Sequence, residues 1–297
     1  MRALPVTLLA ACGLIVTACG TAGASGSASP AGSGSSAAGV PAGQVATQAP
    51  APSADPGAGR GAGGAAKRDR ATGTPRAGSL AGKVVVIDPG HNGGNYRDPK
   101  AVNRKVNVLT QWKACDTTGT STNDGYTEAA FSWDVSNRLA KILKSRGATV
   151  KLTRSDNNSV GPCITQRAAI GNRAKADAAI SIHGDGSAPG NHGFHVIMPK
   201  KINGPVDPVV GDSRRLGLAV RDAYHQGTGL PYSTYIGSKA LDFRSDLGGL
   251  NLSTVPKVFI ECGNMRNAAE AAKFRDPAFR QRVALALANG MQHYLTP

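Results

Sequence analysis

The sequence predicts an α/β fold for residues 83–297, a single domain with a mostly parallel twisted sheet flanked by helices on both faces. Short β-branched or apolar runs alternate along this segment with longer stretches in which apolar residues recur at helical spacing. Strands that alternate with helices are typical of parallel sheets. The segment shows no run long enough to cross a membrane and no internal repeat, so one domain is expected.

The first half of the segment contains the clearest strand and the clearest helix. Residues 83–88 form a β-branched run that ends at Pro89-Gly90, which predicts a buried strand closed by a turn. Between residues 127 and 146 the apolar residues have helical spacing, and Gly147 follows as a stop signal. A strand over 148–153, a helix over 164–175 and a strand over 177–182 complete a β-α-β-α-β order.

The second half continues the alternation. We expect a strand over 193–198, a helix over 213–226, a strand over 257–261 and one or two closing helices over 268–294.

A long polar insertion separates His91 from Glu128, and its only core-like pattern covers residues 106–112. Loops of this length in compact domains are commonly functional, so the insertion is predicted to be an active-site loop or hairpin. Trp112 lies within it. The indole is interpreted as a packing group in preference to a platform that stacks on a sugar.

Residues 1–19 resemble a signal peptide with a lipobox. Arg2 precedes an apolar run over 4–16 that is too short to span a membrane. The run ends in Val16-Thr-Ala-Cys19, and this resemblance implies that Cys19 is lipidated. Ala22-Gly-Ala24 offers a rival cleavage site that would release a soluble protein. We therefore expect an exported protein, either lipid-anchored to the outer face of the membrane or secreted into the periplasm or cell wall.

Residues 20–82 are almost all Gly, Ala, Ser, Pro, Thr and Gln, which predicts a disordered linker. A stretch with so few large apolar side chains cannot bury a core. As a flexible coil of about 60 residues it would have a root-mean-square reach of roughly 40–45 Å. A lipidated protein could then act well away from the membrane surface.

The chain is strongly basic, with 34 Lys and Arg against 19 Asp and Glu. Six of the basic and two of the acidic residues precede residue 83, which leaves 28 and 17 in the domain and a formal charge of +11. Such charge favours polyanionic surroundings, and export makes anionic wall polymers the expected ones. Because the basic residues are scattered and aromatic residues are few, no nucleic-acid partner is predicted.

Three cysteines remain once Cys12 and Cys19 are assigned to the leader. Cys115 and Cys163 lie in polar, turn-rich loops, whereas Cys262 follows an apolar strand and is expected to be buried. Export permits disulfides, so we pair Cys115 with Cys163. In the entropy model this crosslink would stabilise the fold by about 4 kcal/mol. No CxxC spacing supports zinc ligation by cysteines.

Three potential metal ligands lie near the ends of predicted elements. His91 and His183 each follow a buried strand, and Glu128 opens a helix. Two histidines, one carboxylate and an open position form a standard set for catalytic zinc. By themselves, however, the histidines are equally well explained as hydrogen-bonded residues at strand ends.

Four motifs around these residues narrow the choice. They are Ile87-Asp-Pro-Gly-His91, Thr127-Glu128, Ser181-Ile-His183 and Val255-Pro-Lys-Val-Phe-Ile-Glu261-Cys-Gly-Asn-Met-Arg-Asn267. Together they resemble the ligand motifs and the closing pattern of the amidase-3 family of zinc-dependent N-acetylmuramoyl-L-alanine amidases. The order and spacing agree from residue 83 to the end of the chain.

The resemblance implies that His91, Glu128 and His183 hold Zn²⁺ and that Glu261 acts as general base and acid. It also implies the reaction, which is hydrolysis of the amide between N-acetylmuramic acid and L-alanine in peptidoglycan or muropeptide fragments. The alternatives are a zinc carboxypeptidase or deacylase acting on another wall amide, and a wall-binding lipoprotein without activity. The intact set of four residues argues against the last of these.

Two departures from the family pattern occur next to site residues. Gly184-Asp185 stands where the family usually has Ala-Asn, and Cys262-Gly263 stands where it usually has Gly-Phe. Neither departure removes a ligand. The length of the polar insertion before Glu128 leaves open which loops contact the substrate.

Several polar side chains near the site have two interpretations. Glu261 could instead form a salt bridge with Arg244 or Arg266. Arg244 is a candidate for binding a carboxylate or carbonyl of the stem peptide, and an ion pair with Asp246 or Asp242 is equally plausible.

Asp88 and two further histidines complete the candidates. Asp88 either orients His91 or bonds the turn that follows it. His192 and His195 form an H-x-x-H pair with no third ligand nearby in the sequence, so both are interpreted as structural or rim residues.

Overall fold

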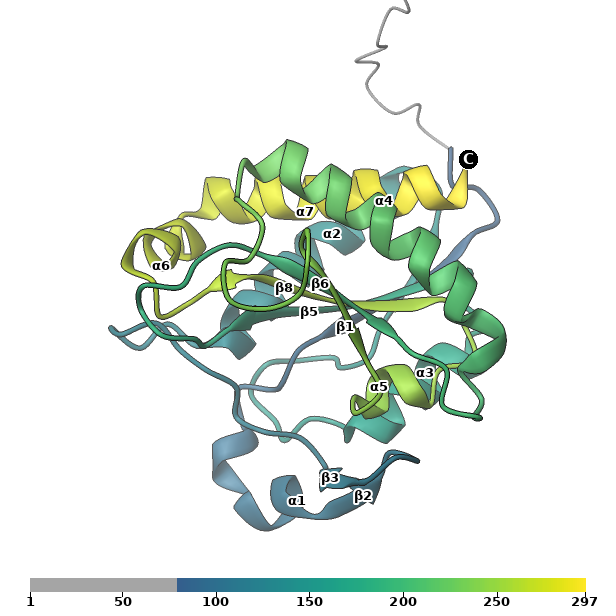
Figure 1. Cartoon of the computed structure of the whole chain (residues 1–297), viewed down its shortest axis with the longest axis horizontal. Helices are drawn as coiled ribbons and strands as arrows, with labels where there is room; N and C mark the ends of the chain where they lie inside the picture. Colours follow the sequence, from purple (N-terminus) through teal and green to yellow (C-terminus); the bar gives the residue numbers. More distant parts are fainter. Residues whose placement is uncertain (1–78) are drawn as a thin grey trace, which may run out of the picture. The chain divides into compact units, whose positions relative to one another are not determined.

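A computed structural model describes residues 79–297, so the predicted signal peptide, Cys19 and nearly all of the predicted linker lie outside the described residues. The described chain folds around a six-stranded sheet with the strand order β4-β1-β5-β8-β6-β7 (Figure 1). The strands are β1 (Val84–Pro89), β4 (Thr149–Leu152), β5 (Ala178–Asp185), β6 (His195–Pro199), β7 (Leu241–Arg244) and β8 (Lys257–Asn264). Neighbouring strands pair in parallel except β6 and β8, which confirms the predicted α/β class.

Helices cover both faces of this sheet. One face carries α2 (Glu128–Ser145), α4 (Val210–Thr228) and α7 (Pro277–Leu295), and the other carries α3 (Ile164–Arg173) and the short α5 (Gly248–Asn251), as Figure 1 shows. Helix α6 (Ala268–Arg275) leads into α7. The larger hydrophobic cluster includes Ile87 and Ile180, whereas their strand neighbours Val86 and Ala179 belong to a smaller cluster. This division follows from the alternation of side chains along a strand.

Helix α2 forms where the sequence predicts it and places Glu128 in its first turn. The Thr127 side chain caps the helix by accepting a hydrogen bond from the Ala130 N–H at 3.3 Å. Four side chains at a spacing of four residues are fully buried: Phe131, Val135, Leu139 and Leu143. Gly147, with a φ of 95°, takes the left-handed conformation that ends many helices. The buried stripe therefore fixes Glu128 relative to the sheet.

The insertion before Glu128 contains a hairpin, as predicted. It comprises a 3-10 turn (Asn95–Arg97), α1 (Pro99–Asn103) and the antiparallel strands β2 (Lys105–Asn107) and β3 (Trp112–Ala114). The packing interpretation of Trp112 is wrong, because the residue is 65% exposed. The hairpin is a separate two-stranded sheet, so only one side of it can pack on the domain.

Two elements differ from the sequence prediction. Strand β5 continues to Asp185, so His183 lies within the strand instead of after it. Strand β7 was not predicted, since its four half-buried residues include Asp242 and Arg244 and form no apolar run. None of the described helices combines the length and hydrophobicity needed to cross a bilayer.

The predicted disulfide between Cys115 and Cys163 is present, with the two Cα atoms 4.5 Å apart. Cys262 is a free, buried cysteine, as its position after an apolar run predicts. The crosslink joins the residue that follows β3 to the residue that precedes α3.

Candidate active site

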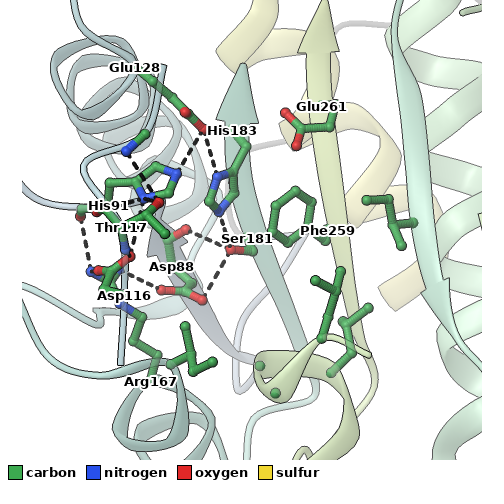
Figure 2. Close-up of a pocket in the computed structure, with 18 of the residues that line it drawn as sticks. Asp88, His91, Asp116, Thr117, Glu128, Arg167, Ser181, His183, Phe259 and Glu261 are labelled. Atoms are coloured by element: carbon green, nitrogen blue, oxygen red, sulfur yellow. Dashed lines mark hydrogen bonds and ion pairs between the residues drawn. The ribbon is translucent and has the colours of Figure 1, made fainter. Parts of the chain in front are cut away.

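The three predicted metal ligands meet at one edge of the sheet. His91 follows β1, His183 lies on the neighbouring strand β5, and Glu128 opens α2 (Figure 2). Glu128 Oε1 lies 3.2 Å from His91 Nε2 and 2.8 Å from His183 Nδ1. One donor atom of each residue falls within 4.8 Å of the others. Two imidazole nitrogens and a carboxylate oxygen converging in this way form a donor set that fits zinc.

The backbone around His91 is shaped to bring the two imidazoles together. His91 has a φ of 55°, in the left-handed region that non-glycine residues seldom adopt. The His183 ring packs directly on Gly90, where a Cβ atom would lie 2.4 Å from Cε1 of that ring. A side chain at position 90 would therefore displace His183.

His91 is oriented by a carboxylate that the sequence analysis missed. His91 Nδ1 lies 3.1 Å from Asp116 Oδ1, and the second oxygen of Asp116 accepts a hydrogen bond from Arg167 at 3.1 Å. Burial by itself would lower the pKa of His91, but Glu128 and Asp116 outweigh it and raise this pKa to about 10.

His183 is held by its own strand and by β8. Ser181 Oγ lies 3.2 Å from His183 Nε2, and the Phe259 ring stacks on the imidazole with 3.9 Å between centroids. These contacts leave Nδ1 directed at Glu128. Burial disfavours the charged imidazole and lowers the pKa of His183.

Asp88 does neither of the things that the sequence suggested, because its carboxylate contacts neither His91 nor the turn. It accepts hydrogen bonds from Thr153, Arg167, Ser181 and Lys257, the last at 2.8 Å. Burial opposes ionisation of Asp88, but Lys257 and Arg167 outweigh it and keep the pKa of this carboxyl far below its usual value. Through Ser181, Asp88 supports His183 instead of His91.

Glu261 faces the same site from β8. It is in register with His183 on β5 and with His195 on β6, so the three residues are side by side on the sheet. Among the described residues, its buried Oε2 atom has no hydrogen-bond partner. The alternative of a salt bridge is therefore wrong for the described chain, since Arg244 binds Asp246 and Arg266 reaches the Ser121 carbonyl. Burial and the Glu128 carboxylate raise the pKa of Glu261 well above its usual value.

A cavity of about 500 Å³ opens onto these four residues. It continues along the sheet past Phe259 to α5, with Lys113 and Arg244 also in its wall. Arg244 donates two hydrogen bonds to Asp246, at 2.7 and 2.6 Å, and Lys113 contacts the same carboxylate at 3.0 Å. Both interpretations of Arg244 are thus compatible with its position, since it forms the ion pair and lines the cavity.

The H-x-x-H pair does not form a second donor cluster. His192 is exposed, whereas His195 is buried in β6, where burial lowers its pKa. The Tyr235 ring lies edge-on to His195 with 6.0 Å between centroids, and the Tyr235 hydroxyl donates to Asp185 at 2.7 Å.

Phe259, Ser181 and Lys257 also belong to the site but were not predicted as site residues, although a sequence signal for them exists. Alternate residues of a strand share a face, so Lys257 and Phe259 lie on the Glu261 face of β8, and Ser181 lies on the His183 face of β5. Asp116 and Arg167 have a weaker signal, their closeness in sequence to the two crosslinked cysteines.

Residues 85–293 match the Amidase_3 family, described as N-acetylmuramoyl-L-alanine amidase. The chain belongs to this family. This amidase is 38% identical over 227 residues to the N-acetylmuramoyl-L-alanine amidase Rv3717 of Mycobacterium tuberculosis, a match that covers 76% of this chain and 90% of the relative. The predicted family and enzyme class are confirmed.

Two solved structures are also similar to this amidase. The N-acetylmuramyl-L-alanine amidase Ami1 of Mycobacterium smegmatis is 37% identical, with a TM-score of 0.69, and the match covers 73% of this chain and 98% of that one. The apo form of Ami1 from Mycobacterium abscessus is 42% identical, with a TM-score of 0.68 and coverage of 73% and 100%. The α/β fold of this amidase is therefore shared with enzymes of the same class.

Proposed function

We propose that this amidase is a zinc-dependent peptidoglycan hydrolase that cleaves the amide between N-acetylmuramic acid and the L-alanine of the stem peptide. The observation that carries the proposal is the convergence of His91, Glu128 and His183 beside the Glu261 carboxylate, whose buried Oε2 has no hydrogen-bond partner among residues 79–297. Amide hydrolysis needs a polarised carbonyl, an activated water and a proton for the leaving amine. This set of residues can meet all three needs.

His91, Glu128 and His183 would hold the metal. The second nitrogen of each imidazole is already engaged, that of His91 by Asp116 and that of His183 by Ser181, which fixes both rings. When bound, zinc polarises the substrate carbonyl and lowers the pKa of water toward about 7.

Glu261 would carry the proton. Its carboxylate accepts a proton from the attacking water and returns it to the amine nitrogen as the amide bond breaks. A raised pKa makes a carboxylate a stronger base, which suits the acceptance of a proton from water. Phe259 supplies an apolar wall beside this group.

Arg244 would contact the peptide part of the substrate from the cavity wall. A guanidinium has five N–H donors, so the pair with Asp246 leaves donors for a carboxylate or carbonyl of the stem peptide. The +11 charge of the predicted domain suits a substrate embedded in anionic wall polymers.

Defined muropeptides test this function. With Zn²⁺ we expect two products, a muramyl fragment with a free lactyl carboxyl group and a peptide that begins with L-alanine. A chelator should abolish release, and added Zn²⁺ should restore it, which chromatography with mass spectrometry can follow. Cleavage at a different amide would support the carboxypeptidase or deacylase alternative. If the protein binds wall material and releases nothing with Zn²⁺ present, the inactive wall-binding alternative is correct.

We further propose that the protein is exported and anchored through lipidated Cys19. The support is the leader sequence, with its short apolar run and lipobox. Cell fractionation should find the wild type with the membrane, and Cys19→Ala should move the protein to the soluble exported fraction. A wild type that is already soluble outside the cell would favour cleavage at the rival Ala22-Gly-Ala24 site.

A further inference from the structure

The loop that carries His91 needs external support. Its backbone is left-handed at His91, a conformation that a residue with a side chain keeps only where its surroundings enforce it. His91 lies three residues after Asp88 of β1, and the pairing of this segment with β5 ends at the hydrogen bond from the Gly90 N–H to the Ile182 carbonyl, at 2.9 Å. The position of the imidazole therefore depends on contacts from elsewhere in the fold.

Arg154 and Ser132 donate to the carbonyls of Pro89 and Gly90, and Arg167 on α3 adds the contact to the backbone of His91 itself. The Arg167 side chain is 4% exposed, and its guanidinium donates to the carbonyl oxygens of Pro89 at 2.6 Å and His91 at 3.0 Å. The two carbonyls flank Gly90, so one guanidinium fixes both sides of the turn. The same group bonds Asp88 Oδ1 at 3.1 Å, which anchors it to β1.

Arg167 also affects the orientation of the His91 imidazole, because it binds Asp116. The two oxygens of Asp116 are divided between His91 Nδ1 and Arg167 Nη2, each at 3.1 Å (Figure 2). Asp116 therefore sets the rotation of the imidazole together with the adjacent Thr117, whose carbonyl and hydroxyl also lie 3.1 Å from Nδ1, and Arg167 sets the position of Asp116. Both side chains are buried, at 6% and 4% exposure.

The disulfide joins the two segments that provide these residues. Cys115 directly precedes Asp116, and Cys163 lies one helical turn before Arg167. A backbone hydrogen bond from the Ile164 N–H to the Cys115 carbonyl, at 2.8 Å, lies beside the crosslink. The crosslink, Asp116 and Arg167 thus form one connected unit, which we call the His91 brace.

We infer that the Cys115–Cys163 disulfide acts through Asp116 and Arg167 to hold His91 in its metal-binding position, so that loss of the crosslink weakens zinc affinity. This inference rests on the proposed zinc site. Asp116 and Arg167 are positioning residues, since neither supplies a donor atom to the cluster of His91, Glu128 and His183. Groups that orient metal-binding histidines commonly affect metal affinity about 10- to 100-fold.

The test measures the dissociation constant for Zn²⁺ of the full chain by competition with a zinc-binding dye. The variants are Cys115→Ser/Cys163→Ser and Arg167→Gln, each expected to bind Zn²⁺ about 10- to 100-fold more weakly than the wild type. Arg173→Gln is the matched control, because Arg173 is an exposed arginine on the same helix and its loss should leave affinity unchanged. Serine replaces both cysteines because a free thiolate or a thiol reductant would itself bind zinc.

Thermal unfolding in chelator separates this role from simple stabilisation. A crosslink that only stabilises the fold would lower the unfolding temperature of the double variant and leave its zinc affinity at the wild-type value, which would overturn the inference. If the double variant fails to fold, Arg167→Gln and Asp116→Asn decide, and wild-type affinity in both overturns it. If the wild type binds no Zn²⁺, the proposed zinc site is wrong. If the wild type and the variants bind Zn²⁺ with equal affinity, the zinc site stands and only the proposed role of the His91 brace is wrong.

Discussion

Replacing Glu261 with glutamine is expected to lower kcat for muropeptide cleavage by about 10²- to 10⁴-fold, the usual contribution of a general base and acid. Glutamine has nearly the same shape but cannot accept the proton of the attacking water. The metal ligands are untouched, so zinc content should not change. Because the buried Glu261 carboxylate has no partner among the described residues and lies near Glu128, the variant should be at least as stable as the wild type.

Glu270 offers a matched control for this experiment. It is another buried glutamate, but its carboxylate accepts hydrogen bonds from the N–H groups of Gly193 at 2.8 Å and Asn264 at 2.7 Å. Glu270→Gln should therefore reduce stability and preserve kcat per folded molecule. Steady-state kinetics, zinc analysis and thermal unfolding on both variants give the comparison. Wild-type kcat in Glu261→Gln would refute the proposed proton transfer.

Replacing Lys257 with methionine is expected to lower the free energy of unfolding by up to about 3–5 kcal/mol, the cost of breaking a buried ion pair, because the buried Asp88 carboxylate then keeps only Arg167 as a cationic partner among the described residues. Lys257 Nζ lies 2.8 Å from Asp88 Oδ2, and both side chains are at most 5% exposed. Methionine has a similar length, so the loss is mainly electrostatic. Lys113→Met is the control, because Lys113 is one-third exposed and its pair with Asp246 should contribute less than about 1 kcal/mol.

The pH dependence of this loss has a definite sign. In the wild type the pKa of Asp88 is depressed below its unfolded value, so the ion pair stabilises the protein above the unfolded pKa of about 4 and loses its effect as the pH falls further. The difference between wild type and Lys257→Met should therefore be largest near neutral pH and shrink in acid. Urea unfolding in chelator at several pH values measures it. Equal losses for Lys257→Met and Lys113→Met would contradict the prediction.

The sequence predicts those helices and strands that are specified by the pattern of apolar residues within the element itself. Helix α2 follows from the spacing of Phe131, Val135 and their successors, and the alternation of strands with helices leads directly to a parallel sheet. Strand β7 lacks such a signal, because its residues are half-buried and two are charged. Trp112 shows the reverse case, since a large aromatic side chain within an apolar pattern is left exposed by a small hairpin.

In the candidate site, too, some residues could be predicted from local sequence motifs and others could not. The motifs around His91, Glu128, His183 and Glu261 identify the groups that would do chemistry. Their supports depend on pairings between distant segments, such as Arg167 with the Pro89 carbonyl 78 residues away, and no local pattern predicts them. Asp88 is an example. It lies three residues before His91 in the sequence, which suggested a contact with that histidine, but through Ser181 it supports His183.

The order β1-β5-β8 has a consequence for how such an enzyme can diversify. His91 follows the first of these strands, and His183 and Glu261 lie in register on the other two, so their separation is governed by the roughly 4.8 Å spacing between hydrogen-bonded strands. The insertion with its hairpin contributes to the cavity wall through Lys113 but supplies none of these three groups. Mutation and recombination can therefore remodel the β2–β3 hairpin, and with it the range of wall fragments accepted, while Cys115 and Asp116 of the same insertion stay in place and descendants inherit the reaction unchanged.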